Sequence, residues 1–190
     1  KVYETGTDIG GTWYWNRYPG ARFDSESYSY GYSFSQEVLD EWDWSEHFAA
    51  QPEILRYLDF VADKFDLRKD IQFETKIASA RFNESQNVWE LQSEDGPLAS
   101  CTFLITATGP LSAAQLPDIK GRDSFGGTSF HTSLWPKEGI DLSGKRVGVI
   151  GTGATGVQVI QTIASEAEHL TVFSLDPNYC APLLNRPIDK

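Results

Sequence analysis

The sequence predicts an α/β protein, and three patterns indicate that class. An apolar segment, residues 145–150, is followed by a glycine-rich turn, a helix-forming stretch to about residue 164, and a second apolar segment, residues 170–173. Residues 52–65 repeat their apolar side chains with the period of a helix. Three short runs, residues 71–73, 80–82 and 88–91, alternate apolar and polar side chains, as half-buried strands do. Helices packed on sheets accommodate both periods.

Composition excludes several classes of protein. The chain has 190 residues, with 16 Lys and Arg against 27 Asp and Glu, which gives a net charge of −11. Such acidity argues against nucleic-acid and anionic-membrane partners, because both need a basic surface. No apolar run approaches the roughly 18–20 residues that span a bilayer. We therefore expect a cytoplasmic, globular protein.

The two cysteines, Cys101 and Cys180, lie far apart in the sequence and show no metal-ligand spacing. We expect neither a disulfide framework nor a metal site. The chain also begins with Lys and contains no Met. That combination predicts an internal part of a longer protein.

The first elements in chain order are a strand, a loop and a helix. Residues 1–4 are predicted to end a strand that leads into a turn, and the aromatic, glycine-bearing residues 10–22 to form a loop. Pro52 suits the first turn of a helix over residues 52–65. The predicted apolar face of this helix comprises Ile54, Leu55, Leu58, Val61, Ala62 and Phe65.

Strand signals then dominate. Three short strands are expected at residues 71–73, 80–82 and 88–91, with a hairpin turn over 83–87. Residues 101–109 are mostly apolar and end in small residues, which predicts a buried strand. Residues 121–136 are rich in glycine and aromatic side chains and are predicted to be a loop.

The strongest functional signal is the turn between strand 145–150 and its helix, which reads Gly151-Thr152-Gly153-Ala154-Thr155-Gly156. In a dinucleotide-binding turn one glycine makes the tight bend, a second lets the backbone approach a pyrophosphate, and a third lets helix and strand pack closely. Free N–H groups at the helix N-terminus then face the phosphate charge. A strand before, a helix after and a second strand beyond favour dinucleotide binding over a mere tight turn.

Residues Ser174, Leu175 and Asp176 follow the second strand, where a dinucleotide-binding unit meets the adenosine ribose. An acid there favours a free 2′-hydroxyl and an arginine favours a 2′-phosphate, so the residues alone lean toward NAD. The alternative is that Asp176-Pro177 is simply a turn.

Glu4, at the end of the first predicted strand, suits the ribose-binding acid of a second dinucleotide fold. The alternative for Glu4 is an ordinary solvent-exposed acid.

Two further segments bear a family resemblance. Phe125-Gly126-Gly127-Thr128-Ser129-Phe130-His131-Thr132-Ser133-Leu134-Trp135-Pro136 matches the FxGxxxHxxxWP fingerprint of type I Baeyer–Villiger monooxygenases. Gly11-Thr12-Trp13-Tyr14-Trp15-Asn16-Arg17-Tyr18-Pro19-Gly20 and Arg22-Phe23-Asp24 resemble that family's flavin-contacting segment. The resemblance covers essentially the whole chain and is nearest to the phenylacetone and cyclohexanone monooxygenase branch.

The resemblance implies two Rossmann-like dinucleotide-binding domains, one for FAD and one for NADP, both only partly present. Residues 1–140 would be part of the FAD domain, ending in the fingerprint linker, and residues 141–190 would begin the NAD(P) domain. The upstream glycine-rich FAD turn and a downstream active-site arginine would lie outside the sequence, so the chain by itself is expected to be inactive.

The resemblance also implies roles for individual residues. Glu4 would hold the FAD ribose, and Asp24 would lie beside the isoalloxazine and orient the essential arginine. The remaining flavin-contacting residues would be Thr12, Trp13, Tyr14, Trp15, Arg22, Phe23, Tyr30 and Ile77. The nicotinamide cofactor would be bound by Gly151, Thr152, Gly153, Ala154, Thr155, Gly156, Ser174 and Leu175. The linker that couples cofactor binding to domain movement would include Phe125, Gly127, His131, Trp135 and Pro136.

Structural alternatives stand beside these roles. His131 could be a hydrogen-bonded structural histidine, and Asp24 could pair with Arg22. Members of the family commonly have Gln-Arg-Thr or Gln-Arg-Ser where this sequence has Ser174-Leu175-Asp176. Because Leu175 cannot bind a 2′-phosphate bidentately, NADPH preference is in question and NAD is possible.

The implied reaction is insertion of one oxygen atom of O₂ into a small ketone to give an ester or lactone, with FAD, NADPH and a flavin C4a-peroxide. One alternative is a flavin monooxygenase that oxygenates nitrogen or sulfur, against which Trp135-Pro136 argues. A second is a non-catalytic nucleotide-binding fragment. A disulfide-reductase-like enzyme is disfavoured because the sequence has no CxxC or CxxxxC pair. The ketone, the enantioselectivity and the oligomeric state are not specified by the sequence.

Overall fold

The computed structural model describes residues 1–176 and 178–189. The chain divides into two compact units. The first unit comprises Lys1–Tyr14 and Leu58–Ala113, and the second comprises Trp15–Tyr57 and Ala114–Lys190. The predicted domain boundary near residue 140 falls within the second unit and stays a prediction.

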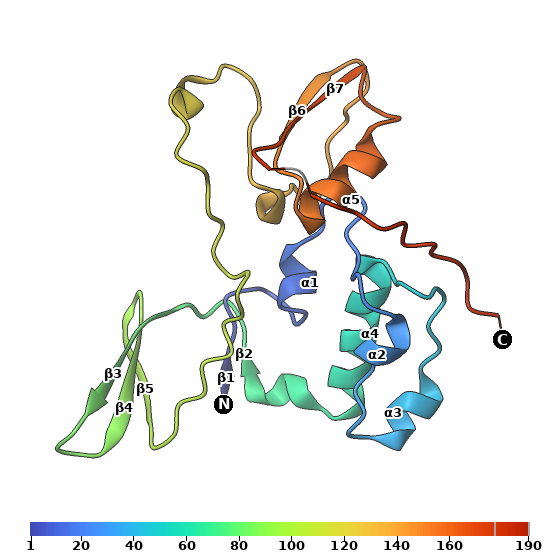
Figure 1. Ribbon diagram of the computed structural model, residues 1–190. Coiled ribbons are helices and arrows are strands. Elements are labelled where there is room, and N and C mark those ends of the chain that lie inside the picture. The colour runs from blue at the N-terminus through green and yellow to red at the C-terminus, as the bar shows by residue number, and fades with distance from the viewer. Residues whose placement is uncertain (177, 190) are drawn as a thin grey trace. The chain divides into compact units, whose positions relative to one another are not determined.

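The first unit contains two small sheets. Strand β1 (Val2–Tyr3) pairs in parallel with β2 (Ile71–Gln72). Strands β3 (Ile77–Asn83), β4 (Val88–Ser93) and β5 (Gly96–Cys101) form an antiparallel meander (Figure 1). The predicted hairpin turn is confirmed, and Asn87 adopts the left-handed conformation there with φ of 56°. The 3₁₀ turn η1 (Leu67–Asp70) leads into β2.

The predicted buried strand at residues 101–109 is wrong. Strand β5 ends at Cys101, and the residues after it are irregular, with Phe103 and Ile105 exposed at 87% and 89%. A fully apolar strand is buried only when neighbouring strands and helices cover it. In the described part of the chain, residues 103–109 pair with no strand. The strand that the alternation pattern did not predict is β5, whose Gly96 and Pro97 conceal its period.

The predicted helix at residues 52–65 is confirmed as α4 (Gln51–Lys64). Ile54, Tyr57 and Val61 are buried along it, in keeping with helical spacing. Phe65, predicted to extend the apolar face, follows the helix end and is exposed at 37%.

One short helix interrupts the loop expected at residues 10–22, whose other residues are not helical, and further short helices occur along the chain. A single turn, α1 (Thr12–Trp15), begins after Gly10 and Gly11, whose carbonyls accept from the N–H groups of Trp13 and Tyr14. One turn is too short to show a helical period, which is why the sequence did not predict it. The others are α2 (Ser27–Tyr30), α3 (Gln36–Glu41), η2 (Arg122–Ser124) and η3 (Thr132–Leu134).

The predicted strand–helix–strand unit is confirmed in the second unit. Strand β6 (Arg146–Ile150), helix α5 (Ala154–Ile163) and β7 (His169–Phe173) follow in order, and the two strands pair in parallel (Figure 1). A buried cluster under this unit comprises Tyr18, Ala21, Leu142, Val159 and Ile163, with Val147, Val149, Leu170, Ile140 and Trp135 packed against it. The helix therefore covers one face of the two-stranded sheet, and the other face leaves Ile150 and Phe173 exposed.

None of the helices in the described part of the chain has the length and apolar content that a bilayer crossing requires.

Candidate functional site

Each glycine of the turn between β6 and α5 meets a different geometric requirement. Gly151 has φ of 103°, a conformation that side chains with a Cβ rarely adopt. A Cβ on Gly153 would meet no atom within 4 Å, so this backbone is open to the outside. A Cβ on Gly156 would lie 2.4 Å from the carbonyl oxygen of Gly151. The three glycines thus supply the bend, the open approach and the close helix–strand packing of a dinucleotide-binding turn.

The N-terminus of α5 is suited to an anion. Gly153 is its N-cap residue, in extended conformation and with no side chain to cap the helix. The first turn contains no acidic residue. The leading N–H groups of a helix have no partner within the helix, and the helix dipole adds positive potential there. These residues fit the pyrophosphate of a dinucleotide.

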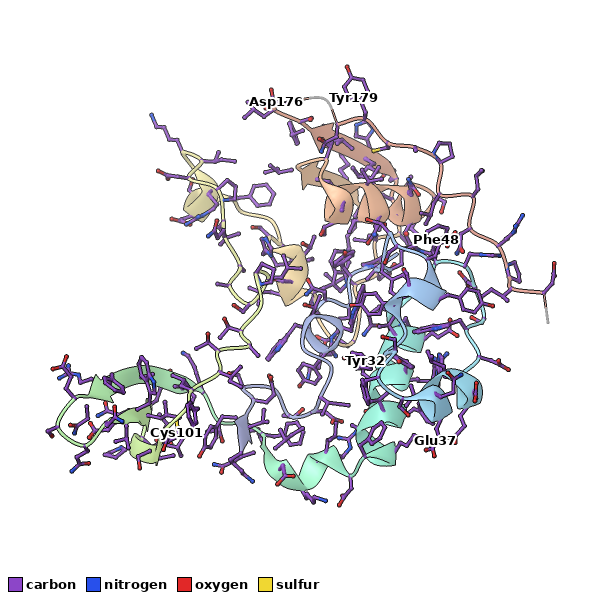
Figure 2. The ribbon with its side chains drawn as sticks, turned by 60° about the horizontal axis from the view of Figure 1, so that its bottom comes forward. Tyr32, Glu37, Phe48, Cys101, Asp176 and Tyr179 are labelled. Carbon is purple, nitrogen blue, oxygen red and sulfur yellow. The ribbon has the colours of Figure 1, made fainter. Side chains whose placement is uncertain are left out.

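The segment that follows β7 is bound to this turn. The Ser174 hydroxyl donates to the Asp176 carbonyl at 2.6 Å, so the 2.9 Å contact between the Thr152 and Ser174 hydroxyls has Thr152 as donor. Asn178 donates its side-chain amide to the Thr152 carbonyl. Leu175 is 98% exposed, and Asp176 and Tyr179 project outward (Figure 2). The proposed Asp176-Pro177 turn includes Pro177, which lies outside the described residues.

Glu4 lies at the end of β1 and is held by the turn that follows. Its Oε1 accepts a 2.7 Å hydrogen bond from the Gly6 N–H. The Tyr14 hydroxyl contacts the Thr7 hydroxyl at 2.8 Å, and a Cβ on Gly6 would lie 2.9 Å from the Tyr14 ring. The structure therefore brings Glu4 and Tyr14 of α1 to one turn, with the carboxylate at the carboxyl end of a parallel strand. A ribose-binding acid occupies this position in a dinucleotide fold.

An arginine with three carboxylate partners supports the same part of the first unit. Arg68 contacts Asp8, Asp59 and Asp63, which joins the loop after Glu4 to the last turns of α4. Burial alone would raise the pKa of Asp8, but hydrogen bonds from Arg68 and the Ile9 N–H outweigh it and lower the pKa. Burial raises the pKa of Asp59, despite the Arg68 charge.

Arg22, Phe23 and Asp24 have three different environments. The Arg22 guanidinium forms an ion pair with Glu46 at 3.5 Å. The alternative in which Arg22 pairs with Asp24 is therefore wrong. Phe23 is buried, with its ring stacked on Tyr30 at a centroid distance of 4.6 Å. Asp24 is exposed, and its Oδ1 accepts a 2.9 Å hydrogen bond from Nε2 of Gln158 on α5.

Tyr18 and Gln158 were not predicted to be functional, although both contact predicted residues. Tyr18 is buried and donates its hydroxyl to Gln158 Oε1 at 2.9 Å. Burial raises the pKa of the Tyr18 phenol, and a hydrogen bond from Thr155 opposes that rise. The available signal was a polar stripe in an apolar helix, because Thr155, Gln158 and Thr162 recur at three- and four-residue spacing on one face.

The linker segment contains a histidine that caps a short helix. His131 Nδ1 accepts from the Ser133 N–H at 3.2 Å and contacts the Ser133 hydroxyl at 2.8 Å. An accepting Nδ1 places the ring proton on Nε2, so the structural interpretation of His131 has direct support. Trp135 packs edge-on against Phe130, with a ring-centroid distance of 5.0 Å, and also packs against the buried cluster under α5. Phe125 is 65% exposed, and a Cβ on Gly127 would lie 2.7 Å from its ring.

The predicted site residues are shared between the two units. Glu4, Thr12, Trp13, Tyr14 and Ile77 belong to the first unit, and Ile77 begins β3. The second unit contains the predicted residues Trp15, Arg22, Phe23, Asp24, Tyr30, Phe125, Gly127, His131, Trp135, Pro136, Gly151, Thr152, Gly153, Ala154, Thr155, Gly156, Ser174 and Leu175. Within the second unit, Asp24 and the glycine-rich turn are brought together through α5. The described residues contain no cluster of three His, Cys, Asp or Glu side chains that could hold a metal ion.

Comparison with known proteins gives relatives along nearly the whole chain. An acetone monooxygenase (methyl acetate-forming) from Gordonia sp. (strain TY-5) is 52% identical and covers 97% of this chain. A Baeyer–Villiger monooxygenase from Pseudooceanicola batsensis is 49% identical over 100% of the chain. The phenazine N-monooxygenase PhzNO1 from Lysobacter antibioticus is 46% identical over 100%. The chain spans about a third of the length of these relatives, 34% to 35%.

A solved structure agrees with these relatives. A crystal structure of OTEMO in complex with FAD and NADP has a TM-score of 0.93 and 54% identity, covering 98% of this chain and 36% of that one. This likeness confirms the predicted α/β class, with Rossmann-like dinucleotide-binding domains. The model of a family described as "FMO-like: Flavin-binding monooxygenase-like" matches residues 1–186. With this match, the resemblance drawn from the fingerprint is confirmed, and the chain belongs to the flavin-binding monooxygenase-like family.

Proposed function

We propose that this chain is part of a flavin-dependent Baeyer–Villiger monooxygenase that converts a small ketone to an ester or lactone in the cytoplasm. The balanced reaction is ketone plus O₂, NADPH and a proton, giving ester, water and NADP⁺. The observation that supports it best is the presence of two nucleotide-binding features in one chain, the acid after β1 and the glycine-rich turn after β6. Two dinucleotides are what a nicotinamide-driven flavoprotein oxygenase requires.

The residues present fit both cofactors. Glu4 would hold the ribose of FAD, because its carboxylate lies at the carboxyl end of β1 and is oriented by Gly6. Gly153 and the N-terminus of α5 would hold the pyrophosphate of the nicotinamide cofactor, because the backbone there is open and uncapped. When bound, NADPH supplies the hydride and FAD supplies the oxygen-activating chemistry.

Asp24 would act on an arginine of the whole protein and not on the substrate. Its Oδ1 is held by Gln158, and the carboxylate has a second oxygen with which to bind a guanidinium. A fixed carboxylate holds an arginine in one orientation, and that arginine would stabilise developing negative charge. Phe23, buried between Tyr30 and Trp44, fixes the backbone beside Asp24.

NADPH is the proposed reductant, with NADH as the competing choice. The protein in the OTEMO structure binds NADP, but Leu175 here offers no charge to a 2′-phosphate. Asp176 is exposed beyond β7 and would favour a free 2′-hydroxyl.

A second candidate function is oxygenation of nitrogen. The relative named as a phenazine N-monooxygenase matches all of this chain at 46% identity. The intact Trp135-Pro136 end of the fingerprint favours ketone chemistry over this candidate.

The test uses the full-length protein loaded with FAD. Acetone, a cyclic ketone, an aryl ketone, a phenazine and an aryl sulfide are each supplied with ¹⁸O₂ and with NADPH or NADH. We expect ester that contains one ¹⁸O atom. Oxygenated phenazine or sulfide without ester would replace the proposal with heteroatom oxygenation. A protein that binds no flavin would support the non-catalytic alternative.

A further inference from the structure

The side-chain amide of Gln158 is fully used by one neighbouring segment. Its Oε1 accepts from the Tyr18 hydroxyl at 2.9 Å and from the Arg22 N–H at 3.4 Å. Its Nε2 donates to the Arg22 carbonyl at 3.0 Å and to Asp24 Oδ1 at 2.9 Å. A glutamine amide has two donors and can accept two such bonds, so every bonding position is occupied.

These partners also determine which way the amide faces. A carboxylate and a carbonyl can only accept, and the Arg22 N–H can only donate. With the amide turned over, Oε1 would face the Asp24 carboxylate and the Arg22 carbonyl, and Nε2 would face the Arg22 N–H. The network therefore permits a single orientation of Gln158.

The backbone around Asp24 is held against α5 independently of that amide. A Cβ on Gly20 would lie 2.3 Å from the Thr162 hydroxyl and 2.6 Å from the Gln158 carbonyl. Tyr18 and Ala21 are buried beside Val159 and Ile163. Because packing already fixes the segment, the amide is left to set the direction of the exposed Asp24 carboxylate.

The same network reaches the glycine-rich turn. Thr155, within the turn sequence, hydrogen-bonds the Tyr18 hydroxyl, which donates to Gln158. Gln158 in turn lies one helical turn beyond Thr155 on the same face of α5. A continuous set of polar contacts thus runs from the anion-binding end of the helix to the carboxylate.

We propose that Gln158 is a positioning residue that aligns the Asp24 carboxylate with the nucleotide-binding end of α5. The inference rests on the proposed function, in which Asp24 orients an arginine beside the flavin. The amide of Gln158 is fully occupied by protein partners, so it would act through Asp24 and not on cofactor or substrate. It makes the geometry at Asp24 depend on the helix whose N-terminus binds the nicotinamide cofactor.

The sharpest variant is Gln158→Glu, which keeps the shape of the side chain and replaces both donors by acceptors. A carboxylate at this position faces Asp24 and the Arg22 carbonyl without a proton to share, and like charges repel. The matched control is Gln161→Glu, which places the same charge on the exposed side of α5. Neither position belongs to the glycine-rich turn.

The first measurement is the coupling of NADPH oxidation to ester formation in the full-length, FAD-loaded protein. We expect Gln158→Glu to lower the ester formed per NADPH by about tenfold, as one displaced charge–charge contact can. Hydrogen peroxide, from NADPH, O₂ and a proton, accounts for the remainder. The KM for NADPH stays within about twofold, and Gln161→Glu behaves as the parent. Unchanged coupling in Gln158→Glu would overturn the proposal, since a merely structural glutamine would not alter this ratio below the melting temperature.

The second measurement needs no catalysis. Melting temperatures are determined for Gln158→Glu, Asp24→Asn and the double variant, in which the introduced amide at position 24 can donate to the introduced carboxylate at position 158. We expect the double variant to regain most of the melting temperature that Gln158→Glu loses. Additive losses would show that the two side chains are uncoupled and would overturn the proposal. If the parent forms no ester from any ketone, the proposed function fails. The melting temperatures of the single and double variants would still decide whether Gln158 positions Asp24.

Discussion

The Cα of Gly156 lies so near the carbonyl oxygen of Gly151 that a Cβ would approach that oxygen to 2.4 Å. Gly156→Ala must therefore push α5 away from the end of β6. Such overpacking costs about 1–3 kcal/mol, and we expect a loss of that order in the free energy of unfolding, measured by urea denaturation. An unchanged stability would contradict the close packing.

Gly153 is the matched comparison within the same turn. A Cβ there meets nothing within 4 Å, and the backbone is in a conformation open to any residue. Gly153→Ala should cost less stability than Gly156→Ala, about 0.5–1 kcal/mol for the poorer N-cap residue, while weakening NADP⁺ binding at least tenfold, because the new methyl group occupies the phosphate approach. Calorimetric titration of the FAD-loaded protein checks the affinity. Parental affinity in this variant would argue against a pyrophosphate at Gly153.

Leu175 is the position at which we expect a substitution to change cofactor preference. It is 98% exposed, so no packing is lost on substitution. Leu175→Arg should improve kcat/KM for NADPH by about 10–100-fold, as hydrogen bonds to a charged group contribute roughly 1.5–3 kcal/mol. The kcat/KM for NADH should change little, and Leu175→Gln serves as the uncharged control. An equal gain with both cofactors would show that the 2′-phosphate does not lie at this residue.

Gly20 combines a left-handed backbone with close contact to α5. Its φ is 82°, and a Cβ would lie 2.6 Å from the Gln158 carbonyl. Gly20→Ala should lower the free energy of unfolding by about 3 kcal/mol, from backbone strain and overpacking together. Gly139 has a similar φ of 77°, and a Cβ there would meet no atom within 4 Å. Gly139→Ala therefore measures the cost of backbone strain without overpacking. Equal losses in both variants would mean that the segment does not pack on α5.

Arg68 should stabilise the protein in a pH-dependent way. Asp8, whose folded pKa is lowered, stabilises the fold above its unfolded pKa of about 3.9 and loses that contribution as the pH falls through the folded value. The effect of Asp59 on stability has the opposite sign, because burial raises its pKa in the folded protein. Ionisation of Asp59 therefore costs stability above its unfolded pKa, and the loss of Arg68 would increase that cost. Both effects make Arg68→Gln harmful at neutral pH.

Because these side chains are partly exposed, we expect Arg68→Gln to cost about 1 kcal/mol at pH 7. The difference from the parent should shrink below about pH 4, where the carboxyls take up protons. Lys69→Gln, which removes a more exposed pair with Asp66, should have a smaller effect. Urea denaturation at pH 7 and at about pH 2, below the lowered folded pKa of Asp8, makes the comparison, and a difference that persists in full at the lower pH would contradict it.

Sequence patterns predicted the elements that depend on residues close together in the sequence. The strand–turn–helix–strand unit from β6 to β7 and helix α4 have strong periods and clear glycine or proline boundaries. The three glycines of the turn followed from chemistry alone, because each has a distinct steric reason to lack a side chain.

Contacts between distant segments could not be predicted in this way. Residues 103–109 have the composition of a buried strand, but burial depends on neighbours that the segment itself does not specify. Gln158 is one of several polar residues in a mostly apolar helix, and only the fold reveals its contact with Asp24. Arg22 and Asp24 are close in sequence, yet each found another partner, Glu46 and Gln158.

The sequence separation of these contacts has a consequence for how the protein folds. The hydrogen bonds of Gln158 to Tyr18, Arg22 and Asp24 span 134 to 140 positions, whereas the meander β3–β4–β5 closes within a single short stretch. Long loops cost more entropy to close, so nearby pairings form first. In pulse-labelled hydrogen exchange, amides of the meander should gain protection early and those of residues 18–24 late. During synthesis and refolding, the alignment of Asp24 would then be among the last features to be acquired.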